Sequence, residues 1–220
     1  PGTVGAPLAG TWGTLTLGPD GRYTYATNAA AQLLAAGQSV QDVFGYTVTD
    51  GTVSSTTTLT ITVVGVNDAP VARPDQNRGD AAGTTPALGN VIAAGAPTDL
   101  ADGDFEGDPL RVQGVRAGAD PGMPAAGGVG TPVAGRFGTV TVGADGRYVY
   151  LVDPANPAVV ALRPGESLTD VFVYTIADPS GATASTTLTI LVDGANDPPT
   201  AGRTALVVDA QQPPGSRGPA

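Results

Sequence analysis

The chain of 220 residues lacks three residue types on which much protein chemistry depends: it contains no cysteine, no histidine and no lysine. Without cysteine it can form neither a disulfide framework nor a thiolate metal site. Without histidine, cysteine or lysine, a serine or threonine nucleophile has no ordinary base. A pair of carboxylates could act as acid and base, but nearly every aspartate falls at a predicted turn or junction. We therefore expect a protein that is not an enzyme.

Long hydrophobic runs and an excess of positive charge are missing as well. No stretch approaches the roughly 18 apolar residues that cross a bilayer, so we expect no membrane insertion. No N-terminal signal peptide is visible, and the chain begins with Pro1, so we expect a processed product or a segment of something longer. The formal net charge of −10 would repel phosphate backbones, which argues against nucleic-acid binding.

Glycine, proline and aspartate are abundant instead. The chain holds 32 Gly and 20 Pro, and its acidic residues are almost all Asp. Gly and Pro at this density are typical of many turns joining short strands, and not of a helical protein. Asp favours turns and is also a short, hard oxygen ligand, whereas Glu favours helices. The composition therefore indicates an all-β protein that could bind cations.

Most of the sequence occurs twice. The offset between the two copies is 125 residues at first and 129 later, so the insertions fall in predicted loops. A period of this size is that of a whole domain, so we predict a tandem array of domains and not a short-repeat solenoid. The matched segments are 13–25 with 138–150, 41–50 with 169–178, 57–61 with 186–190, and the NDAP of 67–70 with the NDPP of 196–199.

Each copy is predicted to be built from β-hairpins. In 13–25 the leucines alternate with threonines up to a turn at Asp20-Gly21, and the tyrosines alternate after it, which is a strong hairpin signal. We interpret Asp20 and Asp145 as turn formers. Residues 29–36 and 154–162 are expected to be short helical crossovers. The aromatic residues on the apolar phase should pack in the two cores, as the pairs Trp12/Phe137, Tyr23/Tyr148, Tyr25/Tyr150, Phe44/Phe172 and Tyr46/Tyr174.

These repeats divide the chain into three parts. Residues 1–69 are predicted to be an incomplete first β-sandwich repeat without its front half, and 70–200 a complete second repeat. Residues 201–220 read as the start of a further repeat or a donor strand, followed by a Pro/Gly-rich tail.

The ordered motifs resemble a known family. "GTLTLGPDGRYTY", "SVQDVFGYTVTDG" and "TTLTITVVGVNDAPVA" are similar to the VCBS-type, bacterial cadherin-like repeat of large secreted (RTX-type) adhesins, and "GNVIA…DGDFEGDPLRV" resembles the front half of such repeats. The resemblance covers about 11–72 and 70–200. It implies tandem Greek-key (Ig/cadherin-like) β-sandwich modules, type I export, a place outside the cell at the bacterial surface, and stiffening by calcium.

Two sets of polar residues are candidate calcium ligands. In the first set, carboxylates at every other position would let one loop wrap a hard cation. The alternative is that these residues form a solvated acidic turn that binds no cation. The candidates there are Asp99, Asp102, Asp104, Glu106 and Asp108. In cadherin-like arrays an Asn-Asp-x-Pro junction offers oxygens to a shared metal, although Asx-Pro also simply ends strands. The junction candidates are Asn67, Asp68, Asn196 and Asp197, together with Asp50 and Asp178 at the end of a predicted strand.

Three functions fit these features. The first is a calcium-stiffened spacer in a bacterial surface adhesin, whose partners are neighbouring repeats of the same or identical chains. The second is a filament subunit, a homopolymer in which residues 203–209 donate a strand to the incomplete first repeat of a neighbour. The third is a carbohydrate- or protein-binding module, for which the unpaired Phe105 is the one exposed aromatic candidate.

Overall fold

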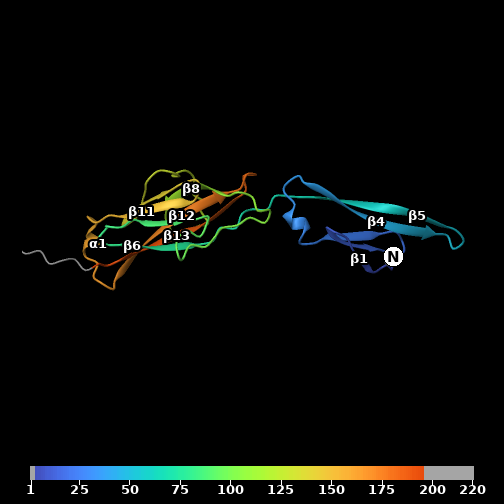
Figure 1. The fold of residues 1–220 in the computed structure, drawn as a ribbon, viewed down its shortest axis with the longest axis horizontal. Coiled ribbons are helices and arrows are strands. Elements are labelled where there is room, and N and C mark those ends of the chain that lie inside the picture. Colours follow the sequence, from blue (N-terminus) through green and yellow to red (C-terminus); the bar gives the residue numbers. More distant parts are fainter. Residues whose placement is uncertain (1–2, 196–220) are drawn as a thin grey trace, which may run out of the picture.

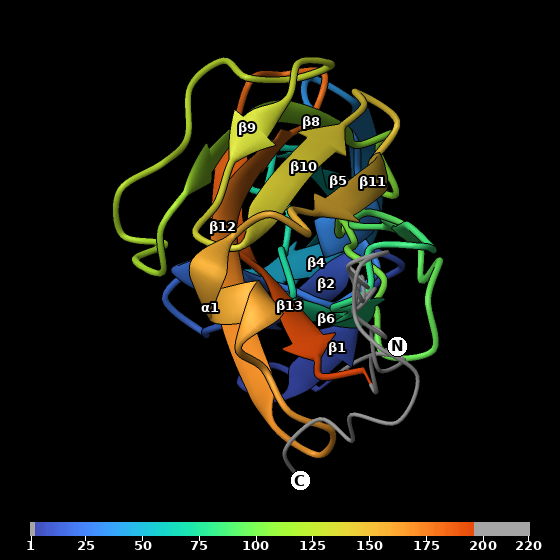
Figure 2. The same ribbon diagram turned by 90° about the vertical axis from the view of Figure 1, so that its left-hand side faces the viewer.

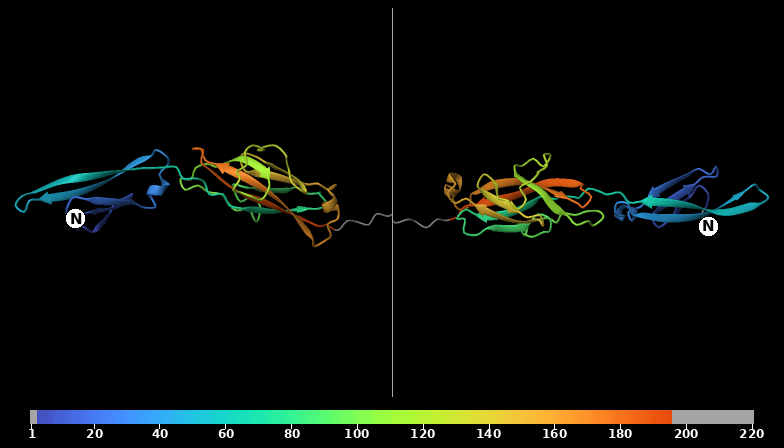
Figure 3. Two further views of the ribbon diagram at one scale, coloured as in Figure 1. Left: turned by 180° about the vertical axis from the view of Figure 1, so that it is seen from behind. Right: turned by 90° about the horizontal axis from the view of Figure 1, so that it is seen from above.

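The computed structural model describes residues 3–195. The chain is almost entirely β and forms two units that lie end to end, joined by an extended linker (Figures 1 and 3). The all-β prediction is therefore confirmed. The predicted boundary at residue 200 and the whole of 201–220, including the proposed donor strand at 203–209, lie outside the described residues.

The N-terminal unit consists of two small sheets and one short helical turn. One sheet has the order β1-β2-β3 and the other pairs β4 with β5. Its elements are β1 (Pro7–Ala9), β2 (Gly13–Leu17), β3 (Tyr23–Thr27), the 3-10 helix η1 (Ala31–Leu33), β4 (Ser39–Thr49) and β5 (Ser54–Val64).

The C-terminal unit is a β-sandwich of two four-stranded sheets with the orders β6-β13-β12-β8 and β7-β11-β10-β9 (Figure 2). The chain passes back and forth between the sheets, as in a Greek key, and β6 pairs with β13 in parallel. Its elements are β6 (Asp75–Asp80), β7 (Ala87–Asn90), β8 (Arg111–Ala117), β9 (Val133–Ala134), β10 (Gly138–Val142), β11 (Arg147–Val152), α1 (Pro157–Val160), β12 (Ser167–Ala177) and β13 (Thr183–Asp193).

Alternation along the strands builds the core of this sandwich. In β12 and β13 every second residue points between the sheets, and the inward positions carry the large apolar side chains. No helix within residues 3–195 is long and apolar enough to cross a bilayer. The most deeply buried core side chains include Val91, Val140, Tyr150, Phe172, Ile176 and Ile190.

The duplication in the sequence is also a duplication in structure. β2–β3 and β4–β5 of the N-terminal unit correspond to β10–β11 and β12–β13 of the other, and η1 and α1 occupy the two predicted helical crossovers. Tyr25 and Phe44 make an edge-to-face contact with ring centroids 6.3 Å apart, and Tyr150 and Phe172 make the same contact at 6.0 Å. These two aromatic pairs make the same contact in both units, as predicted, although Tyr25 is half-buried and Tyr150 is fully buried.

The prediction that all paired aromatics are buried is wrong: Tyr23 is exposed, and Trp12, Tyr25, Tyr46 and Phe137 are only half-buried. The difference between the two copies is largest at Tyr23. Its side chain is 52% exposed, whereas that of its equivalent Tyr148 is 2% exposed. The reason is that Tyr148 is covered by β7 and by the loop containing Asp99, and residues 3–66 contain no counterparts of β6, β7 and β8. Burial of this position is thus decided by strands distant in sequence.

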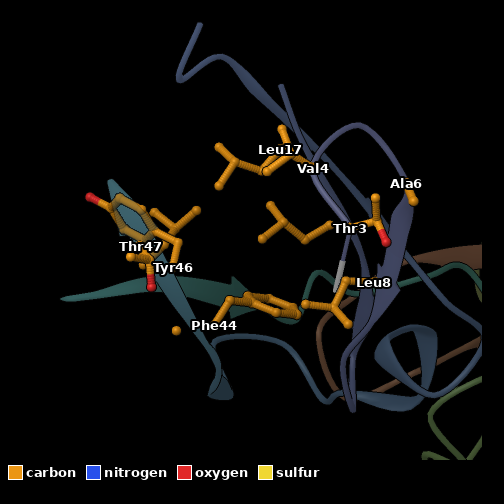
Figure 4. A pocket seen from close by; sticks show the side chains of 11 residues that line it. Thr3, Val4, Ala6, Leu8, Leu17, Phe44, Tyr46 and Thr47 are labelled. Atoms are coloured by element: carbon orange, nitrogen blue, oxygen red, sulfur yellow. The ribbon is translucent and has the colours of Figure 1, made fainter. Parts of the chain in front are cut away.

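The same difference leaves a groove between the two sheets of the N-terminal unit. Its volume is about 290 Å³, and its walls are largely apolar (Figure 4). Phe44 and Tyr46 from β4 face Leu8 and Leu17 across it. In the C-terminal unit, Ala87 from β7 and Val112 and Val115 from β8 are part of the buried core.

Candidate functional site

The linker between the two units is bound to the C-terminal unit through Asn67. Its side-chain amide nitrogen donates to Asp178 Oδ2 at 2.7 Å and to the backbone oxygen of Asp68 at 2.8 Å. Asp178 directly follows β12 and is buried, and its Oδ1 accepts from the backbone N–H of Ala182 at 2.9 Å. The hydrogen bond from Asn67, with further ones from backbone N–H groups, holds the pKa of Asp178 below its usual range.

The acidic loop, residues 99–108 between β7 and β8, binds the linker from the other side. The backbone N–H of Asp68 donates to Glu106 Oε1 at 3.0 Å. Within the loop, Asp104 Oδ1 accepts from the N–H groups of Glu106 at 3.0 Å and Asp108 at 3.3 Å. Hydrogen bonds therefore bring residues far apart in sequence into one group, which we call the junction cluster: Asn67, Asp68, Asp104, Glu106 and Asp178.

Three oxygen atoms of the junction cluster are buried without any hydrogen-bond partner: Asn67 Oδ1, Asp104 Oδ2 and Glu106 Oε2. The orientation of the Asn67 amide is set by its surroundings, because both acceptors near its nitrogen require a donor. Buried polar atoms nearly always have a partner, and leaving one without costs about 1–3 kcal/mol. Three such oxygens in one cluster need a common physical explanation.

The negative charge of the junction cluster is also uncompensated. The ion pairs formed by residues 3–195 are Arg22–Asp20, Arg78–Asp193 and Arg147–Asp145, none of which lies in the cluster. In the same range, no three His, Cys, Asp or Glu side chains are grouped in a way that could hold a metal ion. The free oxygens here belong to two carboxylates and one amide, a set of hard oxygen donors.

Asp99 and Asp102 do not join the junction cluster. Asp99 is buried in the sandwich, where its Oδ2 accepts from the N–H groups of Asn90 at 3.1 Å and Ala96 at 2.8 Å. Asp102 Oδ1 accepts from the N–H of Arg73 at 2.7 Å, and burial raises the pKa of Asp102 to about 7. Both carboxylates thus hold backbone segments in place.

The remaining predicted ligands fall in different places. Asp50, the counterpart of Asp178, lies in the exposed turn between β4 and β5. This turn is at the end of the N-terminal unit away from the linker (Figure 1). There it accepts from the N–H groups of Thr52 and Val53, each at 2.8 Å, and these bonds hold its pKa below the usual range. The candidates Asn196 and Asp197 lie outside the described residues.

The sequence reasoning missed three buried aspartates. Asp42 and Asp170 each accept a hydrogen bond of 2.7 Å from the hydroxyl of a tyrosine in their own unit. Asp75, at the start of β6, accepts from the N–H of Leu100 at 2.8 Å and from the hydroxyl of Tyr174 at 2.7 Å. Asp42 and Asp170 occupy the same position in the two copies, each two residues before a phenylalanine. This repetition could have identified them as structurally important.

A comparison with protein families gives one match. The model of the bacterial cadherin-like domain matches residues 67–194, which is more than half of the chain. The match begins at Asn67 and includes every residue of the junction cluster. No curated protein matches the sequence.

Among solved structures, cadherin repeats are similar to the chain. Mouse cadherin-23 EC22-24 has a TM-score of 0.41 at 14% identity, over 82% of this chain and 50% of that one. Drosophila N-cadherin EC1-4 has a TM-score of 0.34 at 13% identity, over 81% of this chain and 38% of that one. The chain thus spans half or less of these structures, and likenesses this weak identify neither a function nor a binding site.

Proposed function

Because the chain belongs to the bacterial cadherin-like domain family, we propose that it is a calcium-stiffened spacer in a bacterial surface adhesin. Domains of this family are extracellular structural modules of the adhesion type, without enzymatic activity. The finer role proposed for this chain is to hold neighbouring β-sandwiches in line and so to keep a binding region away from the cell.

The junction cluster carries the proposal. It joins the linker to the following sandwich, and its three unpartnered oxygens and uncompensated charge are what a bound cation would relieve. Oxygen ligands from carboxylates and amides suit Ca²⁺. Asn67, Asp104 and Glu106 would hold the ion through these oxygens, and bound calcium would neutralise the local charge.

The residues of the chain itself set the direction of the linker. Asn67 is held by Asp178, which directly follows β12, and Asp68 by Glu106 from the acidic loop, so both sides of the linker are attached to the C-terminal unit. Pro70, two residues after Asp68, restricts the backbone further, because its ring fixes φ. A cation bound here would keep the linker extended, and a string of such modules would behave as a stiff rod.

Calorimetric titration of the full chain with CaCl₂ tests this proposal. The chain has only two glutamates, which provide a matched pair: Glu106→Gln removes a carboxylate from the cluster, and Glu166→Gln makes the same change at an exposed position. We expect calcium to bind and to raise Tm in the wild type and in Glu166→Gln, because a ligand bound only by the folded state stabilises it. In Glu106→Gln both effects should weaken strongly. A wild-type Tm that is the same in calcium and in chelator would refute the proposal.

A further inference from the structure

We propose that Tyr174 and Asp102 are positioning residues for the junction cluster: they keep the acidic loop in register with the linker, so that oxygens from two separate segments belong to one site. This inference rests on the calcium-binding role proposed above. Neither side chain is among the ligands named there. Their effect would be exerted through the backbone segments to which they bind.

The linker and the acidic loop are joined by a ladder of hydrogen bonds. Val71 and Gly103 exchange two backbone bonds of 2.7 and 3.2 Å, forming an antiparallel bridge. On one side of this bridge the N–H of Asp68 binds Glu106. On the other side the N–H of Arg73 binds Asp102 Oδ1 at 2.7 Å. We call this series of contacts the linker–loop ladder.

Beyond the Val71–Gly103 bridge the ladder is completed by side chains in place of carbonyl groups. Pro74 has no N–H to offer, so a regular strand pairing cannot continue through it. Asp102 supplies the acceptor for Arg73, and Asp75 supplies the acceptor for Leu100 at 2.8 Å. The register of the acidic loop therefore depends on two carboxylates that are not part of the junction cluster.

Tyr174 fixes the inner end of the ladder to the sandwich. Its side chain is 1% exposed, and its hydroxyl lies 2.7 Å from Asp75 Oδ2 and 3.4 Å from Asp102 Oδ2. The backbone oxygen of Arg73 is 2.9 Å away. The one hydroxyl thus contacts the start of β6, the linker and the acidic loop together. Tyr174 lies in β12 and Asp178 directly follows it, so the same strand positions both the ladder and the acceptor of the Asn67 side chain.

The C-terminal unit provides a matched control for this tyrosine. Tyr150 is equally buried, and its hydroxyl also donates to a carboxylate, Asp170, over 2.7 Å, but Asp170 binds the loop before β10 and not the ladder. Tyr174→Phe and Tyr150→Phe therefore remove the same kind of bond from the same sandwich. Only Tyr174→Phe loosens the segments that carry the junction cluster.

Calcium titration and amide hydrogen exchange of the folded full chain test the inference. We expect Tyr174→Phe to weaken calcium binding by about tenfold, as the loss of groups that orient metal ligands does. Tyr150→Phe should bind calcium like the wild type. In chelator, the amides of Arg73 and Gly103 should exchange faster in Tyr174→Phe than in Tyr150→Phe, because the ladder opens locally. Equal affinities and equal exchange rates in the two variants would overturn the inference.

A second pair of variants distinguishes the positioning role of Asp102 from the effect of its charge. The pair also tests the inference if Tyr174→Phe does not fold. Asp102→Asn keeps an oxygen that can accept from Arg73, whereas Asp102→Ala removes the acceptor. We expect the alanine variant to lose several-fold more affinity than the asparagine variant, and equal losses would mean that only the charge matters and would overturn the inference. A wild type that binds no calcium would remove the proposed function itself, whereas faster exchange of the Arg73 and Gly103 amides would still demonstrate the ladder.

Discussion

Tyr150 donates its hydroxyl hydrogen to Asp170 over 2.7 Å, in the core of the C-terminal unit. The same carboxylate accepts from the backbone N–H groups of Arg136 at 2.7 Å and Phe137 at 2.9 Å. It therefore connects β11 and β12 to the loop before β10. The N-terminal unit contains the same arrangement in Tyr25, Asp42, Thr11 and Trp12. Burial works against ionisation of Asp42, but the bonds from Tyr25 and the backbone outweigh it and lower its pKa.

Asp170→Asn should destabilise the C-terminal unit. The amide cannot accept three hydrogen bonds as an ionised carboxylate does, and bonds to a charged group contribute about 1.5–3 kcal/mol each. We expect a loss of about 2 kcal/mol in the free energy of unfolding, measured by urea denaturation. Asp145→Asn, in an exposed turn, is the control and should change stability little. Equal effects of the two substitutions would contradict the role given to Asp170.

Gly135→Ala should be destabilising because the backbone passes close to the same carboxylate. A Cβ at this position would lie 2.5 Å from Asp170 Oδ2 and 2.7 Å from the Phe172 ring. Overpacking of this kind costs about 1–3 kcal/mol. Gly45→Ala is the control, because nothing lies within 4 Å of its added Cβ. A lower Tm for Gly45→Ala than for Gly135→Ala would contradict the close approach of the backbone at Gly135 to Asp170.

The stability of the chain in chelator should rise as the pH falls from 8 to 5. Burial raises the pKa of Asp75 to about 6. A carboxyl whose pKa is higher in the folded state than in the unfolded chain binds its proton more tightly when folded, so protonation stabilises the fold as the pH falls through 6. A difference of about two pKa units corresponds to about 3 kcal/mol in full, of which about half is gained between pH 8 and 5. Asp102, whose pKa is raised to about 7, acts in the same direction.

Asp75→Asn should reduce this pH dependence, because the variant has no proton to gain at position 75. Tm measured at several pH values between 5 and 8 checks it. Below pH 4 the trend should reverse, because Asp42 and Asp178 have lowered pKa values and lose their stabilising ionised state on protonation. If Asp75→Asn has the same pH profile as the wild type, Asp75 does not titrate in this range.

Amides in β4 and β5 should exchange hydrogen faster than their equivalents in β12 and β13. The outer edges of β12 and β13 are paired with β8 and β6, whereas β4 and β5 pair only with each other. Phe44 and Tyr46 also border an open groove. We expect exchange at least about tenfold faster in the N-terminal hairpin, since local opening is easiest where few buried contacts resist it. Equal protection in the two hairpins would contradict this.

Local patterns in the sequence predicted the local structure. The alternation around Asp20-Gly21 and its counterpart predicted the hairpins β2–β3 and β10–β11, because strand period and turn chemistry depend only on neighbouring residues. The repeated Phe and Tyr positions predicted the equivalent contacts of Tyr25 and Tyr150. Features that depend on distant strands were not predicted, and the exposure of Tyr23 is the clearest case.

The acidic loop shows the same limit at the candidate site. Its spacing suggested one loop that wraps a cation by itself, whereas hydrogen bonds divide it between two roles. Asp104 and Glu106 belong to the junction cluster, and Asp99 and Asp102 hold backbone segments in the sandwich. This division follows from the pairing of the loop with the linker about thirty residues earlier. No local pattern in the sequence encodes that pairing.

The parallel pairing of β6 with β13 decides how the C-terminal unit would respond to mechanical load. The chain enters this unit through β6, directly after the linker, and both strands run away from the linker side by side. Tension that pulls the entrance of β6 against the exit of β13 would slide the two strands past each other in shear. The backbone bonds between them would then resist extension together and would not open one after another as in a zipper.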